Sequence, residues 1–208
     1  MIYTLALENI TKYFGRQLIF KNINFKFSQG NVYGLAGNNG SGKSTLTKII
    51  AGVLSQNKGK VLHKIDNKEI EAEKLHSYLG FVSPYLMLYD EFTANENLFH
   101  FAKIRGIKFD EERIKYLLNE FNLYRRRNDL LKAYSSGMKQ RMKFIFALQH
   151  SPKLLLLDEP TSNLDEEGKS KVYKIVENEK ENSVVIIASN ESKDLELCSK
   201  LIKVEEYK

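Results

Sequence analysis

Residues 37–44 combine glycines, a lysine and a serine in an order that suits the binding of a phosphate chain. Glycines leave room for backbone N–H groups to turn toward phosphate oxygens, because no side chain blocks them. The Lys43 ammonium can reach the outer phosphates, and the Ser44 hydroxyl can bind Mg²⁺, with Thr45 beside it. The pattern predicts a nucleoside triphosphate site made of Gly37, Asn38, Asn39, Gly40, Ser41, Gly42, Lys43, Ser44 and Thr45.

The same residues could instead form a glycine-rich turn with no ligand. However, the apolar run at 32–36 predicts a strand immediately before the loop, and residues 43–53 predict a helix after it. A helix that begins at the loop adds the positive end of its dipole to the attraction for phosphate. Because a phosphate loop requires a strand, a loop and a helix in series, this context favours phosphate binding.

Two acids, Asp158 and Glu159, follow the apolar run at 154–157. Successive side chains of a strand point in opposite directions, so the two carboxylates can take different roles. Asp158 can hold Mg²⁺ through its water shell, and Glu159 can polarise the water that attacks the terminal phosphorus. The alternative is a pair of acids that ends a strand before the turn at Pro160, and a phosphate loop in the same chain makes this alternative less favourable.

The segments that must position these residues alternate between strands and helices. A mostly helical region lies at 93–150, and a further helix is predicted over Glu166–Glu179. We expect an α/β fold: a P-loop NTPase core with a parallel sheet, an N-terminal antiparallel β subdomain and an inserted α-helical subdomain. The predicted strands and short apolar segments are residues 2–7, 18–27, 32–36, 79–82, 153–157, 183–188, 195–198 and 201–204. The domain boundaries follow as 1–208 for the single domain, 1–83 and 151–208 for its nucleotide-binding core, and about 84–150 for the helical subdomain.

Composition sets wider limits. With 208 residues, of which 42% are hydrophobic, the chain can bury the core of one large domain. Lys plus Arg exceed Asp plus Glu by 32 to 26, which gives a net charge of +6. This charge would permit contact with nucleic acid or an anionic membrane, but we expect most of the charged residues to lie on solvated helix faces.

The single cysteine, Cys198, excludes an intramolecular disulfide and suits a reducing cytosol. No apolar run approaches the ~20 residues of a membrane-spanning helix, and the N-terminal residues lack a secretory signal.

A third segment, residues 134–141, reads Tyr-Ser-Ser-Gly-Met-Lys-Gln-Arg and lies between the phosphate loop and the two acids. These three features, together with residues 160–165 after the acids, resemble the ATP-binding cassette (ABC) family over nearly the whole chain. The resemblance implies that the nucleotide is ATP and that two such domains dimerise head to tail. Ser135 and Gly137 would then contact the terminal phosphate of the ATP held by the partner, and Asp165 would link the two sites. Ser135 and Asp165 also fit helix N-caps, and for Ser135 this role is compatible with phosphate contact.

The resemblance also implies an aromatic ring that stacks on adenine. Phe14, immediately before Gly15, is favoured for this role, and Tyr13 is the reserve. Either ring could instead be a core aromatic, because aromatic residues are common in strands. The segment at 134–141 departs from the commonest family form, with tyrosine in place of leucine at 134, serine in place of glycine at 136 and methionine in place of glutamine at 138.

Two further departures concern hydrolysis. Pro84 stands where the family places a glutamine that touches Mg²⁺, so this contact would be lost, passed to Ser83 or replaced by water. Asn190 stands at the position of the family's switch histidine, and its amide can donate a hydrogen bond to phosphate but can carry neither a proton nor a positive charge. We therefore predict slow hydrolysis with Glu159 as the base, Asn190 as a positioning group and Lys43 on the phosphates. None of the histidines stands at the switch position or has metal-site spacing: His63, His76, His100 and His150.

The resemblance favours the ATPase subunit of a membrane transporter, in which ATP-driven closure and hydrolysis-driven opening push on a separate membrane-spanning protein. We expect the chain to lie on the cytoplasmic face of the cell membrane, attached through that protein and paired with a second ATPase subunit, most simply an identical one. Residues 138–141 look like those of exporter-type cassettes. The apolar residues within 83–92 could dock the membrane subunit or could be buried in the core.

Two rival functions belong to other classes. A soluble ABC-type ATPase acting on nucleic acid or ribosomes would suit the basic charge. Such proteins usually contain two cassettes or a long coiled-coil insertion, so we expect no nucleic-acid partner. A binding-only regulatory module would require that Pro84 and Asn190 have abolished turnover, and the presence of Asp158, Glu159 and Asp165 argues against it. The sequence does not identify the transported substrate.

Overall fold

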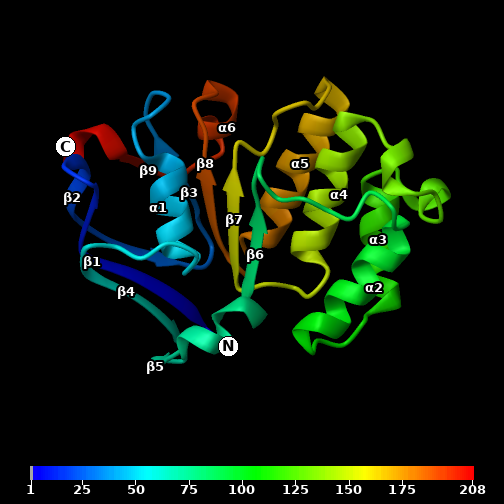
Figure 1. The fold of residues 1–208 in the computed structure, drawn as a ribbon, viewed down its shortest axis with the longest axis horizontal. Coiled ribbons are helices and arrows are strands. Elements are labelled where there is room, and N and C mark those ends of the chain that lie inside the picture. Colours follow the sequence, from blue (N-terminus) through cyan, green and yellow to red (C-terminus); the bar gives the residue numbers. More distant parts are fainter. Residues whose placement is uncertain (1) are drawn as a thin grey trace.

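The computed structural model describes residues 2–208, which form two β-sheets flanked by helices (Figure 1). One sheet is antiparallel, with the strand order β2-β1-β4-β5. Its turns are tight: Gly15 joins the first two strands with a φ of 57°, and Asp66 and Asn67 join the last two with φ values of 48° and 65°. Such left-handed residues give a hairpin turn the twist that antiparallel strands require. The strands are β1 (Tyr3–Phe14), β2 (Gln17–Ser28), β4 (Lys58–Ile65) and β5 (Lys68–Glu69).

The second sheet is parallel and carries the loops of interest. Its strand order is β6-β7-β8-β3-β9, and its strands run in one direction, so the loops that follow them emerge at the same edge. In Figure 1 this edge lies at the arrowheads of β6, β7 and β8. The strands are β3 (Val32–Ala36), β6 (Leu79–Val82), β7 (Leu154–Asp158), β8 (Val184–Ala188) and β9 (Lys200–Lys203).

Side-chain alternation divides the hydrophobic core between the two faces of the parallel sheet. Leu154 and Leu156 pack on one face with α1 (Lys43–Ile50) and the antiparallel sheet. Leu155 and Leu157 pack on the other face with the helices that lie within residues 94–148 and 166–179. Figure 1 shows these two layers on opposite sides of the sheet. Both faces of β7 are covered, which explains why its residues are all buried and its sequence is an unbroken apolar run.

Side-chain caps set the starts of the longer helices. Thr93 and Glu96 form a capping box at the start of α2, and Asp110, Ser135 and Asp165 accept hydrogen bonds at the starts of α3, α4 and α5. The helices are α2 (Ala94–Arg105), α3 (Glu111–Glu120), α4 (Ser136–Leu148), α5 (Glu166–Glu179) and α6 (Ser192–Glu196). Short 3-10 turns lie at η1 (Ala72–Ser77), η2 (Tyr124–Arg126), η3 (Leu131–Ala133) and η4 (Val204–Tyr207).

The expected fold class is confirmed: a parallel sheet, an antiparallel N-terminal sheet and an inserted set of helices. The helix predicted over 43–53 ends earlier, at Ile50, because Gly52 takes a φ of 71° and terminates it. Residues 58–65, where no strand was predicted, form β4, which pairs with β1. The core of the helices at 94–148 is continuous with one face of the parallel sheet, so the predicted helical subdomain has no separate core.

Candidate nucleotide site

The phosphate loop requires glycine at three positions. Gly37, Gly40 and Gly42 have φ values of 149°, 77° and 108°, which other residues rarely adopt. A β-carbon on Gly37 would lie 2.7 Å from Ser41 Oγ, and one on Gly42 would lie 2.7 Å from a methyl group of Ile19. The loop joins β3 to α1, and Gly42 is the N-cap residue of that helix. The free backbone N–H groups of the loop therefore lie beside the positive end of the α1 dipole.

Lys43 and Ser41 place polar groups inside this loop. Lys43 is buried, and its Nζ donates hydrogen bonds to the carbonyl oxygens of Gly37 at 2.7 Å and Asn38 at 3.3 Å. Ser41 Oγ is buried and has no hydrogen-bond partner among the described residues. A buried ammonium and an unsatisfied hydroxyl suit a polar, anionic ligand, because a phosphate oxygen can accept a hydrogen bond from either group.

The Ser44 hydroxyl donates a 2.9 Å hydrogen bond to Asp158 Oδ1, across 114 residues of sequence. The other carboxylate oxygen of Asp158 is buried and without a partner within residues 2–208. Burial raises the pKa of this carboxyl above its usual value, while the Ser44 bond and the positive charges of Lys48 and Lys43 act in the opposite direction. A hydroxyl and a partly unsatisfied carboxylate are oxygen ligands of the kind that Mg²⁺ uses beside nucleotide phosphates.

Glu159 begins the loop after β7 in a left-handed conformation, with a φ of 49°. Its backbone N–H donates to the Ala188 carbonyl at 2.8 Å, which fixes the turn against the end of β8. Burial raises the pKa of its carboxyl, Lys43 lowers it, and the charges of the acids around it, Asp158, Asp194 and Glu191, raise it further. A carboxylate with a raised pKa is a stronger base, which suits removal of a proton from water.

Asn190 reaches the phosphate loop from the end of β8. Its side-chain amide donates a 3.1 Å hydrogen bond to Asn39 Oδ1, and the Asn190 side chain is otherwise exposed. The three loops after β3, β7 and β8 therefore lie together at one edge of the sheet. They bring together Lys43, Ser44, Asp158, Glu159 and Asn190.

The segment at 134–141 begins α4. Ser135 Oγ accepts a 3.2 Å hydrogen bond from the Met138 N–H, and Asp165 Oδ1 accepts one of 2.9 Å from Gly168 at the start of α5. Both residues thus form the N-caps that their local sequence predicts, and both are exposed. Tyr134 is buried and its hydroxyl donates to the Arg126 carbonyl at 2.8 Å, a bond that a leucine could not make. Gly137 packs closely, since an added β-carbon would lie 3.0 Å from the Asn163 carbonyl oxygen.

The aromatic residues near the end of β1 are exposed. Phe14 is 49% accessible and Tyr13 is 37% accessible, so neither is a core residue. The Lys12 ammonium lies 4.8 Å from the centre of the Phe14 ring. An exposed ring at the end of β1 is available for stacking on a planar ligand.

Residues 83–92 are also largely exposed. Tyr85, Met87 and Tyr89 are 74%, 85% and 67% accessible, so the alternative of core burial is wrong for these three side chains. Ser83 is buried and its hydroxyl accepts a hydrogen bond from the Tyr85 N–H, while the Pro84 carbonyl accepts one from Lys143 Nζ. A cavity of about 560 Å³ opens beside this segment, between α1 and the residues of α2 and α4.

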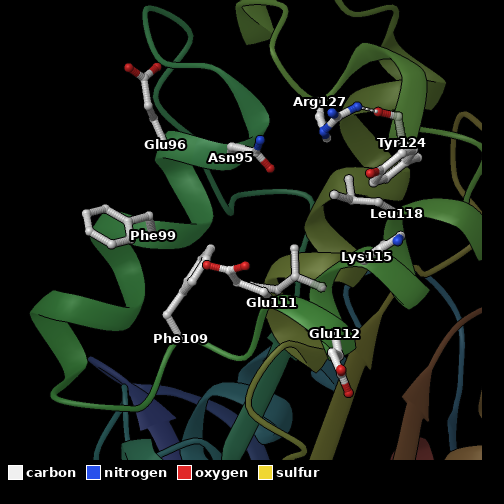
Figure 2. Close-up of a pocket in the computed structure, with 11 residues that line it drawn as sticks. Asn95, Glu96, Phe99, Phe109, Glu111, Glu112, Lys115, Leu118, Tyr124 and Arg127 are labelled. Atoms are coloured by element: carbon white, nitrogen blue, oxygen red, sulfur yellow. Dashed lines mark hydrogen bonds between the residues drawn. The ribbon is translucent and has the colours of Figure 1, made fainter.

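A larger cavity, of about 690 Å³, lies between α2 and α3, away from the phosphate loop. Figure 2 shows Asn95 and Phe99 of α2 on one side of it and Lys115 and Leu118 of α3 on the other. None of the expected nucleotide-binding residues lines it. A search for the nucleotide site by cavity volume alone would therefore select the wrong part of the molecule.

Several residues of the site escaped the sequence analysis. Glu205, near the C-terminus, accepts a 2.6 Å hydrogen bond from the Asn38 N–H of the phosphate loop. Gln140 of α4 donates to the Pro160 carbonyl at 2.9 Å, which ties α4 to the loop after β7. Asp194 of α6 is completely buried beside this loop. Glu205 and Asp194 lie among charged neighbours in the sequence, a pattern typical of solvated turns, so no local signal marks them.

Comparison with known proteins agrees with this geometry. The sequence model of the family described as ABC transporter matches residues 20–162. The chain belongs to the ABC transporter ATP-binding family. It is therefore an ATP-binding domain of the ABC ATPase type, as its loop sequences predict.

Among similar proteins, this ABC ATPase is 35% identical over 97% of its length to the uncharacterised ABC transporter ATP-binding protein YdbJ of Bacillus subtilis (strain 168), and it spans 66% of that relative. It is 34% identical to the putative hemin import ATP-binding protein HrtA of Staphylococcus haemolyticus (strain JCSC1435), with 98% of each chain covered. A solved structure described as a dimeric bacterial ABC transporter cassette is 26% identical, with a TM-score of 0.82 over 97% of this chain and 95% of the other.

Two properties of the described residues bear on membranes and metals. Over residues 2–208, no helix has both the length and the apolar character that crossing a bilayer requires. The same residues contain no group of three or more His, Cys, Asp or Glu side chains placed to hold a metal ion. A magnesium site with two protein ligands and nucleotide phosphates would not need such a group.

Proposed function

We propose that this ABC ATPase hydrolyses ATP with Mg²⁺ and that the resulting motion drives a separate membrane-spanning transport protein. One observation carries the chemical part of the proposal. Three loops from three strands bring a lysine, a serine–aspartate pair, a glutamate and an asparagine to one edge of the parallel sheet. This arrangement can bind a triphosphate chain and act on its terminal phosphorus.

ATP would lie with its phosphates in the loop at 37–44. The backbone N–H groups of this loop and Lys43 would bind the outer phosphate oxygens, and the Phe14 ring would stack on adenine, with Tyr13 in reserve. Ser44 and Asp158 would hold Mg²⁺, which when bound neutralises charge on the phosphates. The partnerless oxygen of Asp158 fits this role.

Glu159 would accept the proton of the attacking water, and its raised pKa supports this assignment. Asn190 would donate a hydrogen bond to the terminal phosphate in place of its present bond to Asn39. Since its amide cannot take up or release a proton, Asn190 would position the phosphate without acting as acid or base. We expect slow hydrolysis because asparagine stands at 190 in place of the family's histidine. Pro84, in place of the family's glutamine, has no side-chain atom that could bind the metal.

A second ATPase subunit, most simply an identical chain, would complete the site. Ser135, Gly137 and Asp165 lie at or beside exposed helix N-termini, where backbone N–H groups attract phosphate. The similarity to a solved dimeric ABC transporter cassette supports this arrangement. Each ATP would then lie between the phosphate loop of one subunit and the start of α4 in the other.

The membrane partner would dock at the cavity beside residues 83–92, where Tyr85 and Met87 are exposed and apolar. This contact would hold the chain on the cytoplasmic face of the cell membrane. HrtA is described as a putative hemin import ATP-binding protein, which supports a transport function but does not identify the cargo of this chain. The exporter-like residues at 138–141 leave export as our expectation for direction.

The deciding experiment combines an ATPase assay of the purified chain with isolation from its native membrane after crosslinking. We expect Mg²⁺-dependent release of phosphate and one membrane-spanning protein crosslinked to the chain. Hydrolysis stimulated by RNA or DNA, with no membrane partner recovered, would instead favour the soluble nucleic-acid-dependent class. ATP binding without any hydrolysis, alone or with the partner, would identify a binding-only module.

A further inference from the structure

A buried carboxylate lies behind the candidate site and belongs to none of the expected motifs. Asp194, in α6, has no exposed surface. Its carboxylate accepts hydrogen bonds from three hydroxyl groups: Ser189 Oγ at 2.7 Å, Tyr173 OH at 3.0 Å and Thr161 Oγ1 at 3.0 Å. Thr161 Oγ1 also lies 3.1 Å from the second carboxylate oxygen. Burying a carboxylate costs free energy, and these three hydrogen bonds offset that cost. Such a complete set of partners indicates that the buried carboxylate holds the surrounding segments in place.

The three donors come from three different segments. Thr161 lies two residues after Glu159 in the loop that follows β7, and Ser189 immediately precedes Asn190 in the loop that follows β8. Tyr173 belongs to α5. One carboxylate therefore holds both loops whose side chains are expected to act on the terminal phosphate.

A second contact reinforces this link. The Glu191 N–H donates a 3.1 Å hydrogen bond to Ser189 Oγ, so the Ser189 hydroxyl donates to Asp194 and accepts from the loop backbone. The Glu191 carboxylate in turn pairs with Lys169 of α5 at 3.1 Å. The loop that carries Asn190 is thus fixed from both sides of that residue, while the Asn190 side chain itself stays exposed.

A carboxylate suits this set of partners. Its oxygens accept hydrogen bonds and donate none, which matches three hydroxyl donors. An asparagine at 194 would replace one acceptor oxygen with an NH₂ donor, so the hydroxyl that faces it would have to rotate and give up its present hydrogen bond to residue 194. The loss would be local, because the side chain keeps its size and shape.

We propose that Asp194 is a positioning residue for ATP hydrolysis, which sets the loop of Glu159 and the loop of Asn190 in one fixed relation through Thr161 and Ser189. This inference rests on the proposed function of Glu159 and Asn190. Asp194 does not touch the nucleotide in this role. Its removal should therefore slow the chemical step while the phosphate loop still binds ATP, since small misplacement of reacting groups is costly to rate.

The test compares Asp194→Asn with Tyr173→Phe in the 208-residue chain. We expect Asp194→Asn to lower kcat roughly ten- to hundred-fold while the KM for ATP changes by no more than about three-fold. Tyr173→Phe removes a donor from α5 but leaves both loops attached, so its kcat should stay within about two-fold of wild type. Asp194→Glu, which keeps the charge, should recover part of the lost kcat. Equal losses in kcat for Asp194→Asn and Tyr173→Phe, or an unchanged kcat in Asp194→Asn, would overturn the proposal.

Hydrogen exchange supplies a readout that is independent of activity. Asp194→Asn should speed amide exchange in both loops, 159–165 and 189–191, whereas Tyr173→Phe should leave these two loops protected. If Asp194→Asn fails to fold, the single changes Thr161→Val and Ser189→Ala should each increase exchange in the opposite loop as well as their own. Exchange that changes in only one loop would overturn the link. A wild-type chain without ATPase activity would overturn the proposed function, and the exchange data would still decide the role of Asp194.

Discussion

The side-chain amide of Asn190 donates a 3.1 Å hydrogen bond to the side-chain oxygen of Asn39, which joins the loop after β8 to the phosphate loop. The two residues are 151 positions apart in the chain. Their contact places Asn190 where an oxygen of the terminal phosphate could replace Asn39 as acceptor. The Asn190 amide can therefore donate a hydrogen bond to that phosphate when it is bound, but it cannot transfer a proton to or from it.

Asn190→His should leave turnover equal to that of wild type or raise it up to about ten-fold. An imidazole can donate the same hydrogen bond and can also carry a positive charge toward the phosphate. The measurement is steady-state kcat with saturating ATP and Mg²⁺. Asn119→His, an exposed change on α3, is the matched control and should have no effect. A kcat for Asn190→His well below wild type would show that Asn190 does more than position phosphate.

Glu159→Gln should lower kcat by roughly a hundred-fold or more and leave ATP bound, because the amide cannot accept the proton of the attacking water. Retained nucleotide can be measured by gel filtration of the chain after incubation with labelled ATP and Mg²⁺. Glu166→Gln, at an exposed position in the first turn of α5, is the control for loss of a negative charge. Unaltered steady-state hydrolysis in Glu159→Gln would remove this residue from the mechanism.

Charge substitutions at Tyr85 and Met87 should prevent co-purification with the membrane subunit and spare ATP binding. Both side chains are exposed, Tyr85 lines the 560 Å³ cavity, and an aspartate at either position would be costly to bury against an apolar partner surface. The assay is affinity purification from detergent-solubilised membranes. Tyr116→Asp, which alters a partly exposed tyrosine on α3, should keep the partner. Intact co-purification of both Tyr85→Asp and Met87→Asp would place the docking surface elsewhere.

The chain should become less stable as the pH falls from about 6.5 to about 4. Burial lowers the pKa of His63 from 6.5 to about 4, and its Nδ1 lies 2.6 Å from the Tyr3 hydroxyl. Within this window the unfolded chain binds a proton that the folded chain rejects, so the free energy of unfolding rises with pH. The His63 contribution is complete above the unfolded pKa and is lost as the pH falls. It corresponds to about 2 kcal/mol between pH near 7 and pH near 5.

Urea denaturation at these two pH values checks the contribution of His63. His63→Gln should weaken the pH dependence of the free energy of unfolding, because glutamine does not titrate. His76→Gln changes an exposed histidine and should leave the dependence as in wild type. The pKa of His150 is also lowered to about 4 by burial, so part of the dependence should persist in both variants. An identical pH dependence in His63→Gln and wild type would contradict the prediction.

The sequence by itself determined which residues can bind phosphate and which residues cap the helices beside them. Phosphate binding depends on glycines and a lysine at fixed spacing, and the chain places them between a strand and a helix that follow each other directly. Ser135 and Asp165 were recognisable as N-caps because a cap contacts a residue only three positions away. Strand β4 was missed, since its lysines and half-exposed side chains carry little apolar alternation.

Only the tertiary structure decided which of these parts meet. The order β7-β8-β3 brings Asp158 to Ser44 and Asn190 to Asn39, and this order depends on strand pairings between distant segments. Asp194 stands among charged residues that read as a solvated turn, yet packing of α6 against α5 and two loops buries it completely. The physical reason is that covalent geometry fixes local spacing, whereas long-range pairing and burial follow from covering all apolar faces of the chain at once.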